Sequence, residues 1–125
     1  MSQSLAYEQG IATIANRAFG HTLETNGWVR NDQSLTSSVL GDGGIYSSTA
    51  DLAKWDAALY KSKLLKQPML QAAFTAHIPT DEPGRSYGFG WYISEYRGLA
   101  QIWHSGETRG FRNRFVRFPE KKLTV

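Results

Sequence analysis

Nine consecutive residues near the end of the sequence, 103–111, carry the side chains best suited to chemistry. His104 has an imidazole side chain, a group that can donate to a substrate carboxylate or take part in proton transfer. Ser105 adds a hydroxyl, Gly106 leaves backbone N–H groups open to an anion, and Glu107 follows. The same residue types also fit a structural role, with His104 a satisfied residue beside Trp103. Composition alone favours the structural role for His104.

No serine in the sequence has the setting of a nucleophile. A nucleophilic serine needs a base within hydrogen-bond reach and an oxyanion hole. The sequence contains no Ser-x-x-Lys, no Gly-x-Ser-x-Gly and no Tyr-x-Asn. Ser48 stands three residues before Asp51 and is predicted to cap a helix instead. No set of residues has the spacing of metal ligands, so we predict neither a metal nor a cofactor.

Composition places the chain among folded proteins. Its 125 residues suffice for one domain, and 41% of them are hydrophobic. Because there are no cysteines, disulfides and thiolate metal sites are excluded. For the same reason, cysteine usage does not indicate whether the protein works in an oxidising or a reducing compartment. No apolar run reaches the length of a membrane span, and the sequence has no signal-peptide pattern. We therefore predict no membrane span and assign no localisation.

The positive charge is concentrated near the end of the sequence. Residues 105–125 hold six basic and two acidic residues, giving +4, so the remainder carries −1 of the total +3. Such a strand fits a solvated, aggregation-resistant edge or an anionic partner. Residues 109–118 resemble the signature of the RNA-contacting strand in RNA-recognition motifs, but three residues, 112–114, stand where the signature has one. No sequence like the second signature strand of these motifs lies upstream. Nucleic acid is not predicted as a partner.

The elements that must position these residues are helices first and strands afterwards. A helix is predicted at 49–61 and a second near Pro68, and part of 5–19 has helical spacing. Residues 20–44 read as a long loop with a turn signal at Asn26-Gly27. Strands are predicted at 87–96, 99–104, 111–118 and 123–125, with turns at 97–98 and 105–110. The expected class is α+β with an antiparallel meander, in a single partial domain over 1–125: helices and loops at 1–85, strands at 86–125.

Three segments together resemble the serine β-lactamase-like family, which includes class C β-lactamases, penicillin-binding-protein-like carboxypeptidases and related esterases. They are Gly41-Asp42-Gly43-Gly44-Ile45-Tyr46-Ser47-Ser48-Thr49-Ala50-Asp51-Leu52, Tyr87-Gly88-Phe89-Gly90-Trp91 and His104-Ser105-Gly106-Glu107-Thr108-Arg109-Gly110-Phe111.

The resemblance implies a role for each residue of the third segment. His104 takes the position of the lysine in the family's Lys-Thr-Gly motif, and Ser105 supplies the hydroxyl that binds substrate carboxylate or carbonyl groups. Gly106 lets substrate approach the strand, and the N–H of Glu107 is the second oxyanion donor. The nucleophile's own N–H is the first donor, in an upstream Ser-x-x-Lys.

The resemblance also implies that the chain corresponds to the C-terminal third to half of such a hydrolase, cut at both ends. We expect it to be inactive alone, and to take a small acyl substrate only when the missing half complements it. The alternative is a stand-alone binding module that forms a homo-oligomer through an open sheet edge.

Overall fold

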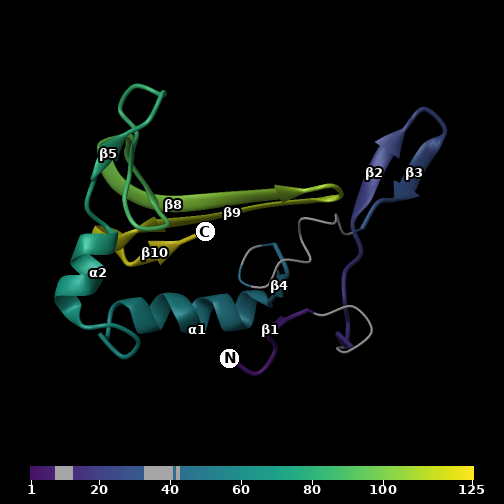
Figure 1. Ribbon diagram of the computed structural model, residues 1–125, viewed down its shortest axis with the longest axis horizontal. Helices are drawn as coiled ribbons and strands as arrows, with labels where there is room; N and C mark the ends of the chain where they lie inside the picture. The colour runs from purple at the N-terminus through teal and green to yellow at the C-terminus, as the bar shows by residue number, and fades with distance from the viewer. Residues whose placement is uncertain (8–12, 33–40, 42) are drawn as a thin grey trace. The chain divides into compact units, whose positions relative to one another are not determined.

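The computed structural model describes residues 1–7, 13–32, 41 and 43–125 (Figure 1). Contacts between Cα atoms divide the chain into two compact units. The first unit is drawn from residues 1–54 and 106–113, and the second from residues 55–105 and 114–125. Three elements carry residues of both units: the helix α1 (Thr49–Leu59) and the strands β8 (Leu99–Thr108) and β9 (Phe111–Phe118).

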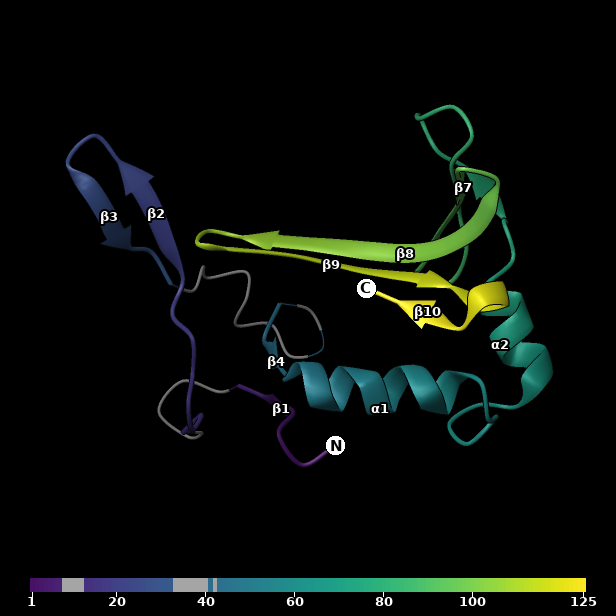
Figure 2. The same cartoon turned by 180° about the vertical axis from the view of Figure 1, so that it is seen from behind.

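The described residues form two α-helices and a six-stranded sheet in the order β10-β9-β8-β7-β6-β5 (Figures 1 and 2). Sheet neighbours are also neighbours in sequence, and the α+β class with an antiparallel meander is confirmed. The elements are α1 (Thr49–Leu59), α2 (Gln67–Ala73), β5 (Ile78–Pro79), β6 (Ser86–Tyr87), β7 (Tyr92–Tyr96), β8 (Leu99–Thr108), β9 (Phe111–Phe118), the 3-10 helix η2 (Pro119–Lys121) and β10 (Leu123–Thr124).

The hydrophobic core of the second unit joins its helical residues to its sheet. Leu59 and Leu70 are buried from the helices, and Trp91 and Ile102 from the sheet and the loop that enters it. Removing side chains of this kind from water contributes about 1.5–3 kcal/mol each. Partly buried residues complete the cluster: Trp55, Ala73, Phe74, Ile93 and Phe115.

A buried ion pair crosses this core. The Arg117 side chain is 1% exposed, and its Nε donates to Asp56 Oδ1 over 2.5 Å. The guanidinium also lies 4.7 Å from the Tyr60 ring centroid and 5.1 Å from that of Phe74. Its Nη1 is buried and has no hydrogen-bond partner among the residues that the structure describes. One carboxylate and several aromatic rings therefore hold the charge.

The first unit contains two small sheets. Strand β1 (Leu5–Ala6) pairs with β4 (Ile45–Tyr46), and β2 (His21–Glu24) forms a hairpin with β3 (Gly27–Arg30). The hairpin turns at the predicted Asn26-Gly27 signal, where Gly27 has φ +115° and no added Cβ would meet an atom.

Two predictions for the first half of the sequence were wrong within the described residues. The helical spacing in part of 5–19 forms no helix among the described residues 5–7 and 13–19: residues 5–6 form β1, and Asn16 has a left-handed φ of +54°, which an α-helix does not tolerate. The loop predicted at 20–44 contains the β2–β3 hairpin instead. Residues 8–12, 33–40 and 42 of these segments lie outside the described residues.

Two strand predictions also need correction. The strand predicted at 87–96 is interrupted between β6 and β7, because Gly90 adopts φ +79°. A Cβ at Gly88 in the same interruption would lie 2.3 Å from the Ala73 carbonyl oxygen. The turn predicted at 105–110 is shorter than expected: β8 continues to Thr108, and only Arg109 and Gly110 form the turn.

Candidate active site

Strand β8 extends beyond the end of its neighbour β7. Pairing between the two begins at Tyr96↔Leu99 and ends at Tyr92↔Trp103. Residues 104–107 of β8 continue past this last pair, and no other strand of the described chain pairs with that edge. The four residues that the sequence singled out thus lie on a strand with one open edge, not in a Gly-rich turn.

His104 is exposed and held by aromatic residues of the second unit. Its Nε2 lies 2.9 Å from the Tyr87 hydroxyl. Its ring stacks on Tyr92 with centroids 5.4 Å apart and an interplanar angle of 26°. The imidazole is therefore oriented through one nitrogen while the side chain as a whole faces solvent.

Ser105 has an exposed side chain, and its hydroxyl makes no hydrogen bond within the described residues. A serine hydroxyl can both donate and accept, so it is chemically available to a ligand. The structure thus leaves free the hydroxyl that the sequence singled out.

Gly106 differs from the glycines that the fold requires. A Cβ at Gly106 would lie 3.2 Å from Asn113 Oδ1, the end of a side chain that can shift. At Gly110 the same atom would lie 2.3 Å from His21 N and 2.4 Å from Asn31 O, which are backbone atoms. Packing therefore demands a glycine at 110 but not at 106. Because Gly106 has no side chain, a ligand can approach the strand backbone closely at this position.

Glu107 directs its charge toward the neighbouring strand. Its Oε1 accepts from Arg112 Nη2 over 2.8 Å, and both side chains are exposed. An exposed pair of this kind is worth little to stability. The carboxylate is balanced by Arg112.

The sheet beside His104 carries positive charge on aromatic rings. The guanidinium of Arg114 lies 4.0 Å from the Trp103 ring centroid, and that of Arg85 lies 4.7 Å from it. Trp103 is buried and donates through Nε1 to Ser94 Oγ over 3.0 Å. Arg85 is paired with Glu82, whereas Arg114 has no ion pair within the described residues. This surface favours a ligand that carries negative charge.

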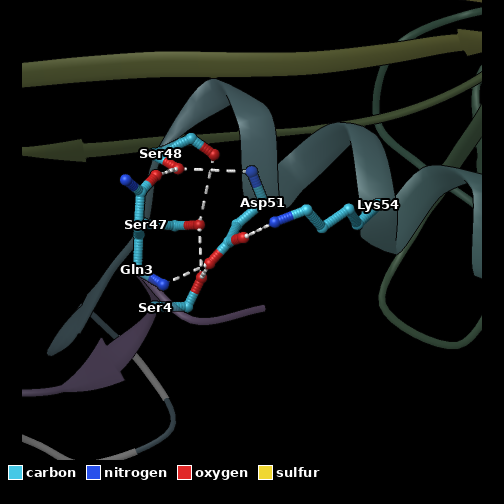
Figure 3. A network of polar contacts seen from close by, with 6 residues as sticks. All are labelled: Gln3, Ser4, Ser47, Ser48, Asp51 and Lys54. Atoms are coloured by element: carbon cyan, nitrogen blue, oxygen red, sulfur yellow. Dashed lines mark hydrogen bonds and ion pairs between the residues drawn. The ribbon is translucent and has the colours of Figure 1, made fainter.

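Ser48 caps α1, as predicted, and is not set up as a nucleophile. Its Oγ accepts from Asp51 N over 3.2 Å and lies 2.7 Å from Gln3 Oε1 (Figure 3). Neither histidine nor lysine contacts this hydroxyl within the described residues. The reciprocal half of the capping box is absent, because the Asp51 carboxylate bonds elsewhere.

The Asp51 carboxylate is fully buried and is surrounded by donors of the first unit (Figure 3). Lys54 Nζ lies 2.8 Å from Oδ1, while Gln3 N donates to Oδ2 over 2.7 Å and Ser4 Oγ over 3.0 Å. The bond from Lys54, followed by those from Gln3 and Ser4, lowers the pKa of Asp51 well below its usual range, although burial opposes the shift. The network fastens the segment before β1 to the start of α1.

A partly buried charge also lies in the first unit, at Arg17. Its Nη2 donates to Asp32 Oδ2 over 2.5 Å and to the Tyr46 hydroxyl over 2.8 Å. Burial raises the pKa of Tyr46, an effect that the nearby Arg17 opposes. A cavity of about 810 Å³ is lined by Arg17 and Tyr46 and also by Asn113, the residue beside Gly106. Sequence patterns did not reveal these contacts of Arg17, because Asp32 and Tyr46 lie 15 and 29 residues further along the chain.

Metal binding and membrane crossing also bear on the partners of the chain. Within residues 1–7, 13–32, 41 and 43–125, no group of three or more His, Asp or Glu side chains is arranged to hold a metal. No helix in the same ranges has the length and apolar character to cross a membrane.

The chain belongs to the beta-lactamase family: the family model matches residues 5–125. Penicillin-binding protein 4* of Bacillus subtilis is 28% identical over 88 residues, which cover 70% of this chain and 20% of that protein. The resemblance drawn from the three sequence segments is thereby confirmed.

Two solved structures resemble the chain. A penicillin-binding protein from Bacillus halodurans matches with a TM-score of 0.78 and 26% identity, covering 94% of this chain and 36% of that one. An octameric penicillin-binding protein homologue from Pyrococcus abyssi matches in fold with a TM-score of 0.85 and 24% identity, covering 99% and 29%. The chain thus spans between a fifth and about a third of the length of these relatives.

Proposed function

We propose that the chain forms one wall of the acyl-transfer site of a β-lactamase-like serine hydrolase. The open edge of β8 from His104 to Glu107 carries the proposal. An exposed strand edge can hydrogen-bond an extended substrate backbone, while adjacent side chains read its substituents. In such a site the hydrolase acts by serine attack on an ester or amide carbonyl, followed by hydrolysis of the acyl-enzyme.

Each residue of this edge has a proposed role. His104, oriented by Tyr87, donates to the substrate or moves a proton, and the Ser105 hydroxyl binds a carboxylate or carbonyl oxygen. Gly106 admits the substrate to the backbone, and the N–H of Glu107 stabilises the oxyanion. Losing one oxyanion donor costs about 10²–10³ in kcat in serine hydrolases.

The chain alone should not turn over substrate, because the sequence lacks Ser-x-x-Lys. The test incubates the purified chain with nitrocefin and with a p-nitrophenyl ester, with and without a serine-directed phosphonate. No turnover is expected. Turnover that the phosphonate abolishes would place a nucleophile within these 125 residues and refute this part of the proposal.

The wall itself is tested by complementation. A separate polypeptide carrying the family's Ser-x-x-Lys and Tyr-x-Asn segments is added to the chain, and ester hydrolysis is followed. Activity should appear only in the mixture, and should fall by about 10²-fold or more when Gly106→Val blocks the oxyanion side. Thr22→Val, in the β2–β3 hairpin, is the control that should leave the activity unchanged. Equal activity for Gly106→Val and the parent chain would remove β8 from the site.

The second candidate is a module that oligomerises through its sheet edge. The Pyrococcus abyssi homologue is octameric, and β10 pairs only with β9 among the described strands. An unpaired edge can accept a strand of another copy. Size-exclusion chromatography with light scattering distinguishes a stable oligomer from a monomer, and a monomer at all concentrations rules this candidate out.

A further inference from the structure

The connection from α1 to α2 exposes several large apolar side chains among lysines and other polar residues. Every residue from 60 to 69 is exposed, including Leu64 at 57%, Leu65 at 42% and Met69 at 55%. Phe89, from the loop between β6 and β7, is 65% exposed. Scattered exposed apolar residues are ordinary, but a contiguous group of them marks an interaction surface.

These four residues, which we call the apolar patch, border one groove of about 360 Å³ in the second unit. The groove is lined otherwise by Trp55, Leu59, Leu70, Ala73, Phe74 and Trp91, so it contains no charged group. The patch is therefore continuous with the hydrophobic core rather than isolated on the surface. A surface of this kind can bind apolar groups of a partner.

The same connection carries unopposed positive charge. Lys61, Lys63 and Lys66 are exposed, and none of them forms an ion pair within the described residues. The segment from residue 60 to 74 contains no aspartate or glutamate. Ser62 adopts φ +50° and its hydroxyl donates to Gln67 Oε1 over 2.7 Å, which gives the connection a fixed bend.

We propose that the apolar patch and its three lysines dock on the surface of an anionic phospholipid bilayer. Exposed Leu, Met and Phe side chains enter the boundary between headgroups and acyl chains, by about 5–10 Å in known interfacial segments. Lysines beside them pair with anionic headgroups, and long side chains reach outward while their stems stay in apolar surroundings. A second copy of the chain fits less well, because facing patches would bring the two lysine clusters together.

The test is flotation of the full 125-residue chain with vesicles of phosphatidylcholine, with and without phosphatidylglycerol. We expect binding to vesicles that contain phosphatidylglycerol. Lys63→Glu with Lys66→Glu should weaken it by more than about tenfold, since each lysine near an anionic surface is worth about fivefold. The matched control, Lys121→Glu with Lys122→Glu, makes the same charge change outside the patch and should alter binding by less than about twofold.

The apolar contribution is tested with Leu64→Ser and Phe89→Ser, which replace exposed side chains and so should preserve the fold as judged by circular dichroism. Both should abolish flotation. No flotation of the parent chain overturns the proposal, as does equal loss from both lysine pairs. Light scattering on the same samples decides the remaining alternative: self-association that Leu64→Ser removes would assign the patch to a second copy.

Discussion

The pair formed by Asp56 and Arg117 should respond asymmetrically to mutation. Arg117 is 1% exposed and Asp56 is 15% exposed, so only the carboxylate retains contact with water. Asp56→Leu leaves the guanidinium buried without its partner, which we expect to lower the free energy of unfolding by about 3–5 kcal/mol. Arg117→Met leaves a carboxylate that water can reach, and the thioether can pack among the aromatic rings, so about 1–3 kcal/mol is expected.

The double variant should be more stable than either single variant. Replacing a whole buried ion pair by apolar side chains is about neutral or stabilising, so the two losses should not add. For a double variant of about neutral stability, the coupling in the double-mutant cycle equals the sum of the two single losses, about 4–8 kcal/mol, which exceeds the roughly 0.5–3 kcal/mol usual for contacting residues. For a domain with about 5–15 kcal/mol of total stability, the Asp56→Leu loss is large.

Urea unfolding followed by tryptophan fluorescence measures the cycle, because Trp91 lies 5.9 Å from the Arg117 guanidinium. Asp81→Leu, on an exposed loop residue, is the matched control for the carboxylate-to-leucine change and should alter stability by less than about 0.5 kcal/mol. Additive losses would refute the reasoning. So would a larger loss for Arg117→Met than for Asp56→Leu.

Three further outcomes are expected from residues of the first unit. Because the pKa of Asp51 is lowered in the folded state, its carboxylate stabilises the fold above an unfolded pKa of about 3.9 and loses this effect as the pH falls. The urea concentration at the unfolding midpoint of the parent chain should therefore decrease as the pH is lowered below about 4, and it should decrease less for Asp51→Asn. Equal pH profiles of the two proteins would contradict this. Gly106→Ala should change the free energy of unfolding by less than about 1 kcal/mol, since only the Asn113 side chain must shift. Gly110→Ala should cost about 3 kcal/mol in the same urea assay, because its Cβ would meet backbone atoms; matching midpoints for the two glycine variants would be the contrary result.

Local patterns predicted the elements whose causes are local. Ser48 fixes the start of α1 through one bond to a residue three positions on, and Pro68 marks the first turn of α2. The meander follows from short turns between strands, and β9 has the predicted bounds of Phe111–Phe118. In each of these cases a few neighbouring residues hold the information.

What the sequence could not show depends on distant partners. Asp51 fits a capping box, yet its carboxylate bonds Gln3 and Ser4, 48 and 47 residues away. Gly106 reads as a turn residue, but the pairing of β8 within the sheet keeps it in a strand. The types of the four candidate site residues were readable; the open strand edge on which they lie was not.

The Asp51 network also has a consequence for synthesis on the ribosome. At about 5–20 residues per second, Gln3 and Ser4 leave the tunnel on the order of 2–10 seconds before Asp51 can reach them. Closing so long a loop is entropically costly, whereas the β2–β3 hairpin needs only its own neighbouring residues. Gln3 and Ser4 can therefore be bound by Asp51 only after α1 has emerged, whereas the β2–β3 hairpin can form before that.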